Sequence, residues 1–196
     1  MKIILMRHGK PDFDFSRRVK ATDFAHIIQE YDTAGIVDQP STQAMELVQC
    51  CNAVVVSDLA RSHLSAQALM LENIVLSSAL FREVPLPYPN NGNFTFSVSI
   101  WAVLLRVAWL LGYSQNGESF KVASNRAKAA AGVLMQLAEE HGSVLLIGHG
   151  ILNRLLAKEL RKQGWRAKIS PSSKHWAFGV YKMKTSIPIP QKISYK

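Results

Sequence analysis

Short, continuous apolar runs alternate along the chain with stretches that have helical periodicity. Apolar runs bounded by helices are typical of parallel strands that are buried on both faces of a sheet. We therefore expect an α/β fold, a three-layer α/β/α sandwich with a mostly parallel central sheet. The pattern predicts strands at residues 2–6, 53–57, 74–81, 143–147 and 176–183, and helices at residues 41–51, 59–71, 117–141 and 151–163.

The chain shows no linker or internal repeat, and its 196 residues suit one domain. We expect a single domain over residues 1–196, with a helical cap or insertion at residues 84–114 and a tail at residues 185–196. Residues 12–39 are polar and irregular, which favours loops with one short helix. The pattern predicts no particular oligomeric state.

Two cysteines, Cys50 and Cys51, are adjacent within a predicted helix. They are too few and too close for a disulfide framework or a thiolate metal site, so we interpret both as packing residues. Arg7 and His8 interrupt the first apolar run before it reaches the length of a signal-peptide core. We therefore expect a cytoplasmic protein.

The formal net charge of +9 favours anionic partners: phosphorylated metabolites, phosphoproteins, nucleic acid or an anionic surface. The lysines and arginines are scattered, and no aromatic-and-basic motif of a nucleic-acid reader is present. We expect no binding of nucleic acid. Three arginines, Arg17, Arg18 and Arg106, could contact additional negative charge on a ligand, although a solvated or structural role fits each of them better.

Histidines follow two of the predicted strands. Arg7-His8-Gly9 comes directly after the first apolar run, and Gly148-His149-Gly150 comes directly after residues 143–147. The carboxyl ends of parallel strands form the crevice in which ligands bind, so we expect both imidazoles to face one pocket. Arg61 follows a third strand, in the first turn of the next helix. Two imidazoles beside two arginines indicate chemistry on a phosphoryl group.

The residues around His8 suit a nucleophile. A neutral imidazole nitrogen can attack phosphorus when the other ring nitrogen donates to a carbonyl, which fixes the tautomer. Arg7 and Arg61 can supply planar bidentate donors to the phosphoryl oxygens. Gly9 would let the backbone approach a phosphate closely.

The second histidine and one carboxyl group complete the predicted site. Gly150 begins a helix, so its backbone N–H and the helix dipole attract an anion beside His149, which can then hold the phosphoryl group. Glu83 is the best-placed acid for the leaving oxygen, with an ion pair to Arg82 or Lys121 as the alternative role. The remaining histidines lack paired zinc spacing, and we interpret them as surface or core residues: His26, His63, His141 and His175.

Residues 94–111 are apolar over almost the ~20 residues that a membrane span needs. Arg106 near the middle disfavours insertion, and a crossing would put His8 and His149 on opposite sides of the membrane. We therefore expect no span but a buried helix, with a lid over the substrate or a subunit contact as alternatives.

By these residues the chain resembles the histidine phosphatase superfamily, the phosphoglycerate mutase-like family. Residues 7–9 resemble its signature, residues 55–61 its second-arginine motif, residues 146–150 its second-histidine motif, and Gly117-Glu118-Ser119 with Arg126 its helix-opening segment. The resemblance extends from Met1 to about Leu160. It implies an α/β/α sandwich, a phosphohistidine intermediate on His8, a phosphate pocket from Arg7, Arg61 and His149, Glu83 as proton donor, and neither a metal nor another cofactor.

The chain departs from this family at several positions. Pro11 and Asp14 stand where many members have a small hydroxyl residue and an asparagine, and proline removes a backbone donor. Residues 85–89 replace the usual glycine-rich continuation after Glu83 with a proline-rich one. The extended segment with which a true mutase closes over its substrate is not found.

The sequence therefore predicts a metal-independent phosphomonoester hydrolase that forms a phosphohistidine on His8. Its substrate would be a phosphorylated small molecule or a phosphoprotein. Two alternatives remain open at this point. One is a catalytically weak or inactive phospholigand-binding or regulatory protein with the same fold, and the other is a phosphomutase.

Overall fold

A six-stranded sheet with the order β4-β3-β6-β1-β8-β7 forms the centre of the computed structural model, which describes residues 1–169, 172 and 174–183. β1, β3, β4 and β6 are parallel, whereas β8 runs antiparallel to β1, and β7 antiparallel to β8. The predicted mostly parallel sheet is thereby confirmed. Its strands are β1 (Lys2–Arg7), β3 (Ala53–Ser57), β4 (Ile74–Ser78), β6 (Ser143–Gly148), β7 (Trp165–Ile169) and β8 (Phe178–Met183).

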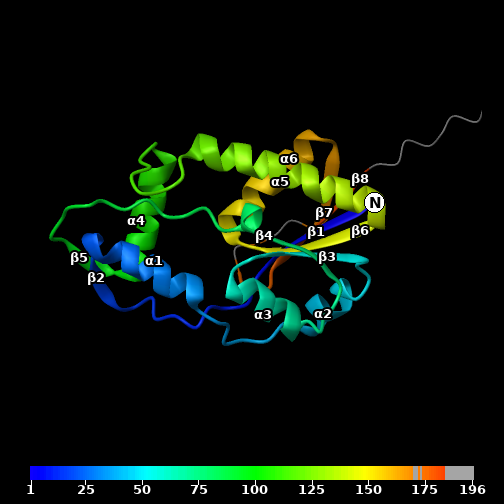
Figure 1. Ribbon diagram of the computed structural model, residues 1–196, viewed down its shortest axis with the longest axis horizontal. Helices are drawn as coiled ribbons and strands as arrows, with labels where there is room; N and C mark the ends of the chain where they lie inside the picture. Colours follow the sequence, from blue (N-terminus) through cyan, green and yellow to red (C-terminus); the bar gives the residue numbers. More distant parts are fainter. Residues whose placement is uncertain (170–171, 173, 184–196) are drawn as a thin grey trace, which may run out of the picture.

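Helices cover both faces of this sheet, as Figure 1 shows: α2 (Thr42–Val48) and α3 (Ala60–Ala68) on one face, α5 (Phe120–His141) and α6 (Gly150–Lys162) on the other. Alternate residues of β1 enter the two apolar cores. Ile3 and Leu5 pack with α5 and α6, while Ile4 and Met6 pack with α2 and α3. Burial on both faces explains why the strand sequences are continuously apolar. The predicted α/β/α sandwich is confirmed.

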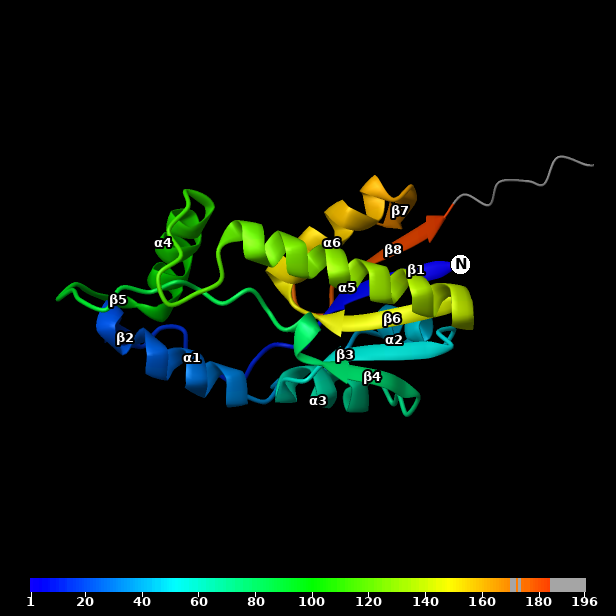
Figure 2. The same cartoon turned by 45° about the horizontal axis from the view of Figure 1, so that its top comes forward.

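A smaller lobe lies beyond the carboxyl end of β6, as Figure 2 shows. β2 (Arg18–Lys20) and β5 (Thr95–Ser97) form its two-stranded antiparallel sheet, and α1 (Phe24–Thr33) and α4 (Val98–Leu110) pack beside it. The lobe has an apolar cluster of its own, and Trp101 Nε1 donates to the Val19 carbonyl at 3.0 Å. Buried members of this cluster include Val19, Phe24, Ile27, Trp101 and Leu105.

The predicted elements are present with altered ends. The strand expected at residues 74–81 ends at Ser78, because a 3-10 helix, η2 (Ala79–Phe81), follows it. Residues 12–39 contain α1 as expected, together with β2 and the 3-10 helix η1 (Ala21–Asp23). β2, β5 and β7 were not predicted. The first two have three residues each, and β7 is a largely exposed edge strand, so none has a strong apolar pattern.

α4 corrects the expectation of a fully buried helix at residues 94–111. One face packs into the lobe through Val98, Trp101 and Leu105, and Trp109 packs with Val84 and Ala123. The opposite face is exposed, with Val103 64% and Leu110 62% accessible. The inner face borders the pocket described below, and the alternatives of a lid or a subunit contact stay predictions. Within residues 1–169, 172 and 174–183, no helix combines the length and apolarity needed to cross a membrane.

The two cysteines lie just after α2 instead of inside it. Cys51 is buried and packs with the core under α2 and α3, whereas Cys50 is exposed. The packing interpretation is therefore right for Cys51 and wrong for Cys50. The predicted tail at residues 185–196 lies outside the described residues, and the division into one domain with a cap at residues 84–114 stays a prediction.

Candidate active site

The ends of β1 and β6 bring the two predicted histidines together. The strands are parallel neighbours in register, with Arg7 opposite Gly148, so the following residues lie side by side. The ring centroids of His8 and His149 are 4.9 Å apart. Both side chains are nearly inaccessible, at 1% and 0% exposure. The juxtaposition expected from the strand pattern is present.

His8 is held as one tautomer. Its Nδ1 lies 2.7 Å from the carbonyl oxygen of Gly9, and a carbonyl can only accept, so Nδ1 carries the hydrogen. Nε2 then holds the lone pair. Burial, and next the positive charge of Arg61, hold the pKa of His8 well below its usual range. The ring is therefore neutral near pH 7, the state that a nucleophilic imidazole requires.

Gly9 has a packing role that differs from the expected contact with phosphate. A Cβ at this position would lie 2.6 Å from Cζ2 of Trp176 and 2.9 Å from Oδ1 of Asp38, so no side chain fits. Trp176 Nε1 donates to that same Asp38 oxygen at 2.8 Å. The Gly9 N–H donates to Ser65 Oγ at 2.9 Å. These contacts fix the carbonyl that orients His8.

His149 immediately precedes α6 and is buried with both ring nitrogens unpartnered among the described residues. Burial, and then the charges of His8 and Arg61, lower the pKa of His149 well below its usual range. Buried polar atoms are normally hydrogen-bonded. The ring is thus suited to contact a polar group that enters beside His8.

Arg7 and Glu83 meet at the first residue of α6. A Cβ on Gly150 would lie 3.6 Å from Arg7 Nε and 3.6 Å from Glu83 Oε2. The Glu83 carboxylate accepts hydrogen bonds from the N–H groups of Ile151 and Leu152, at 3.1 and 3.0 Å. The second and third N–H groups of α6 therefore contact Glu83, and the predicted contact of the Gly150 N–H with the substrate anion stays a prediction.

The alternative pairings of Glu83 are not found. Arg82 instead forms a bidentate pair with Asp58, with Nε and Nη2 at 2.6 and 2.7 Å from its two oxygens. Among the described residues no ion pair joins Lys121 to Glu83. The third donor to the Glu83 carboxylate is the N–H of Val84, at 2.9 Å. Three backbone N–H groups, those of Val84, Ile151 and Leu152, thus orient the Glu83 carboxylate.

Arg126 fixes the backbone that leads to Glu83. Its Nη1 donates to the carbonyls of Leu80 and Arg82 at 3.0 and 2.8 Å. Its Nε and Nη2 pair with the Glu118 carboxylate at 2.8 and 2.7 Å. The segment 117–119 and Arg126, which belong to the motif found in the sequence, therefore position the candidate acid.

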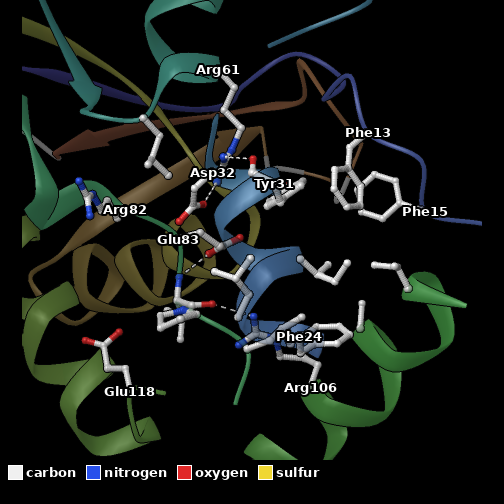
Figure 3. A pocket seen from close by; sticks show the side chains of 18 of the residues that line it. Phe13, Phe15, Phe24, Tyr31, Asp32, Arg61, Arg82, Glu83, Arg106 and Glu118 are labelled. Atoms are coloured by element: carbon white, nitrogen blue, oxygen red, sulfur yellow. Dashed lines mark hydrogen bonds and ion pairs between the residues drawn. The ribbon is translucent and has the colours of Figure 1, made fainter. Parts of the chain in front are cut away.

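Arg61, the second residue of α3, is 1% exposed. Its Nη1 donates to the Tyr31 carbonyl at 2.9 Å, and its Nη2 pairs with Asp32 Oδ1 at 3.3 Å. The guanidinium carbon lies 4.4 Å from the centre of the Tyr31 ring. Figure 3 shows these contacts at the pocket wall. The last turn of α1 therefore holds Arg61, a role that the irregular segment 12–39 did not reveal.

A cavity of about 740 Å³ opens beside these groups, between the sheet end and the lobe. Arg7, Arg61 and Glu83 border it, whereas the buried rings of His8 and His149 do not form its wall. His175 does border it, and its ring centroid is 5.7 Å from that of His8. Burial, and then the charge of Arg7, lower the pKa of His175 to about 4.

His175 was expected on the surface or in the core, and its place at the pocket is a correction. It precedes β8, and the pairing of β8 with β1, together with the hydrogen bond from the Trp176 N–H to the Arg7 carbonyl at 3.1 Å, brings this loop to His8. No spacing in the sequence signals that approach. The other histidines lie elsewhere: His26 pairs with Glu30, and His63 contacts Ser77.

Asp14, one of the residues at which the sequence departs from the family pattern, has local partners. Asp14 is exposed and accepts from the backbone and hydroxyl of Ser16, so it does not point toward the pocket. Arg17 pairs with Glu30, and Arg18 donates to the Thr95 carbonyl. All three arginines have structural partners, as expected, because Arg106 Nη2 donates to the Val84 carbonyl at 2.8 Å; Arg106 also borders the pocket. In the described part of the chain, no group of three or more His, Cys, Asp or Glu residues is arranged to hold a metal.

No protein-family model matches the sequence, and no curated protein matches it significantly. Solved structures do match. The structure of Rv3214 from Mycobacterium tuberculosis is similar with a TM-score of 0.60 and 18% identity, over 95% of this chain and 93% of that one. A mutant phosphoserine phosphatase from Entamoeba histolytica in complex with phosphoserine is similar with a TM-score of 0.53 and 17% identity. That match covers 82% of this chain and 80% of the other.

A third similar structure is the ecdysone phosphate phosphatase from Bombix mori in complex with tungstate, with a TM-score of 0.53 and 14% identity. That match covers 100% of this chain and 95% of the other. These structural neighbours are members of the histidine phosphatase superfamily. Together with the six-stranded sheet and its flanking helices, they show that this chain has the histidine phosphatase fold.

Proposed function

We propose that this protein is a metal-independent phosphomonoester hydrolase that forms a phosphohistidine on His8. The observation that carries the proposal is the hydrogen bond from His8 Nδ1 to the Gly9 carbonyl, which leaves the Nε2 lone pair for attack on phosphorus. Similar structures include a phosphoserine phosphatase and an ecdysone phosphate phosphatase, which supports this class of reaction.

In the first step, His8 Nε2 attacks phosphorus in line with the ester bond, and the N–P bond forms as the P–O bond breaks. The guanidiniums of Arg7 and Arg61, with the His149 ring, offset the charge on the phosphoryl oxygens. Arg61 Nε has no partner among the described residues, so it can donate to one of these oxygens. Glu83 gives its proton to the leaving alkoxide.

In the second step, a water molecule attacks the phosphohistidine. The Glu83 carboxylate, now deprotonated, takes a proton from this water as the O–P bond forms. The N–P bond breaks, inorganic phosphate leaves, and His8 regains its neutral ring. The arginines and the histidine supply the charge stabilisation in both steps, so the reaction as written uses no metal.

The pocket favours a phosphorylated small molecule over a phosphoprotein. Small-molecule sites are concave cavities of about 300–1,000 Å³, and this one has about 740 Å³. α4 flanks it through Val98, Ala102 and Arg106.

Phosphate release from an aryl phosphate, measured with a chelator present, tests the proposal. We expect His8→Ala to lose at least about 10³-fold in kcat, and the wild-type protein to yield an acid-labile phosphate on the peptide that contains His8 after rapid quenching. His26→Ala, at a side chain that is 73% exposed, is the matched control and should retain full activity. Unchanged turnover in His8→Ala refutes the proposal.

A second function, phospholigand binding without turnover, is favoured by two observations. The His8 side chain is 1% exposed, and the Tyr31 carbonyl and Asp32 already occupy two nitrogens of Arg61. A ligand would then bind at Arg7 without reaching His8. Calorimetric binding of inorganic phosphate with neither phosphohistidine nor product release supports this function, and steady product release excludes it.

A further inference from the structure

Most of the pocket wall is apolar. A tetrahedral phosphate beside Arg7 and Arg61 fills only a small part of the cavity volume of about 740 Å³. Figure 3 shows Glu83, Asp32 and Arg61 on one side and the rings of Phe13, Phe15 and Phe24 on the other. Wall residues remote from the arginines of the strand ends include Phe13, Phe15, Phe24, Ile28, Val98 and Ala102.

This wall is part of the fold of the lobe. Phe24 and Val98 are buried members of its apolar cluster, and Phe13 and Ile28 pack against that cluster. Phe13 also makes an edge contact with Phe15, with ring centroids 5.1 Å apart. The side chains that face the cavity are therefore held by packing, so the cavity is preformed.

From these features we propose that the substrate is the monophosphate ester of a bulky, mainly apolar alcohol. The inference rests on the proposed function and names the substrate class of that site. With the phosphate between Arg7 and Arg61, the alcohol part extends among the aromatic and aliphatic side chains of the lobe. A polar alcohol part, such as that of phosphoserine or phosphoglycerate, would lose its hydration there without gaining matched partners.

Arg106 is the polar group of the wall that most favours a different substrate. Its Nη1 is buried and has no partner among the described residues, so it could meet a carboxylate. However, its Nη2 donates to the Val84 carbonyl at 2.8 Å, and its guanidinium carbon lies 4.9 Å from the centre of the Trp109 ring. These contacts tie Arg106 to the fold. Because only Nη1 of Arg106 is left to donate, it can form a hydrogen bond to a single oxygen of an otherwise apolar alcohol.

A series of linear alkyl phosphates, from ethyl to decyl, tests the proposal with the full chain below the critical micelle concentration. Burying one methylene group changes a binding or rate constant by about fourfold. We expect kcat/KM to rise by about two- to fourfold per methylene until the pocket is filled. A flat or falling series, or a preference for phosphoserine or phosphoglycerate over hexyl phosphate, overturns the proposal.

Two substitutions on α4 locate the effect. Ala102→Phe puts a ring into the wall, and we expect it to reduce the advantage of decyl over ethyl phosphate by at least about tenfold. Val103→Phe adds the same ring at a position that is 64% exposed, and the chain-length dependence should not change. If both variants reduce the decyl-to-ethyl preference equally, the alkyl chain does not bind at the apolar wall beside Ala102.

Binding separates failure of this inference from failure of the proposed function. Alkyl phosphonates cannot be hydrolysed, and calorimetry measures their affinity for the wild-type protein. An affinity that rises from ethyl to decyl phosphonate supports the apolar substrate class even if no ester is cleaved. An affinity that does not depend on chain length overturns the inference even if aryl phosphates are cleaved.

Discussion

Glu83 has two roles that substitution can separate: proton transfer, and support of the N-terminus of α6. Its carboxylate accepts from the N–H groups of Val84, Ile151 and Leu152, at 2.9, 3.1 and 3.0 Å. His149, the residue that precedes α6, provides no side-chain cap. Glu83 therefore provides the cap from a distant segment. Losing a helix cap costs typically about 1 kcal/mol, and hydrogen bonds to charged groups contribute about 1.5–3 kcal/mol each.

We expect Glu83→Ala to lower the free energy of unfolding by about 1–2 kcal/mol, because water reaches part of the exposed donors. Glu83→Gln keeps an amide oxygen as acceptor and should lower it less. Denaturant unfolding measures both values. Glu72→Gln, at an exposed carboxylate, serves as the control for loss of one negative charge.

The kinetic effect of Glu83→Gln should depend on the leaving group. General acid catalysis contributes about 10²–10⁴-fold. With para-nitrophenyl phosphate the leaving group needs no proton, so a burst of para-nitrophenol should remain, followed by slow turnover because water lacks its base. With hexyl phosphate the first step itself needs the proton, so the burst should disappear.

Rapid-mixing measurements on both substrates test whether Glu83 protonates the leaving oxygen. If Glu83→Gln slows the burst equally for para-nitrophenyl and hexyl phosphate, then Glu83 does not protonate the leaving oxygen. If neither step slows, Glu83 supports α6 and takes no part in proton transfer. The unfolding data show in each case whether the folded state persists.

Three further predictions follow from the surroundings of the site. Arg126→Ala should lower the free energy of unfolding by about 2–3 kcal/mol and kcat by about 10- to 100-fold, since Glu83 loses its support; destabilisation with unchanged kcat would contradict that positioning role. Gly9→Ala should cost about 1–3 kcal/mol through overpacking, and an unchanged melting temperature would disprove the predicted clash. The pKa values of His8 and His149 are lowered in the folded protein, so the unfolded chain binds protons first as the pH falls. The free energy of unfolding should therefore be constant above the ordinary histidine pKa of 6.5 and decrease below it. Equal free energies of unfolding at about pH 7 and about pH 5 would refute this.

The confirmed predictions rest on local sequence patterns that fit one kind of secondary structure. Ile3 to Met6 are apolar at every position, and a buried parallel strand is the element that places such residues on two covered faces. Once β1 and β6 are parallel strands, the histidines that follow them lie at one sheet edge, and their identification needed no tertiary information.

The features that the sequence did not reveal depend on contacts between distant segments. The carboxylate of Glu83 faces α6 because Arg126 holds the preceding backbone. His175 approaches His8 because β8 pairs with β1. The sequence did not show which face of α4 is exposed, because its exposed face is as apolar as its buried face.

The amino-acid sequence alone determined the layered fold and the pairing of His8 with His149 at one sheet edge. Strand burial and the rule that parallel strands end at one edge are enough for that. Only the tertiary structure decided the tautomer of His8, the partners of Arg61 and Glu83, and the apolar walls of the pocket. Each of these arises from side chains that meet across long sequence separations, and their distances are set by packing, which no local pattern encodes.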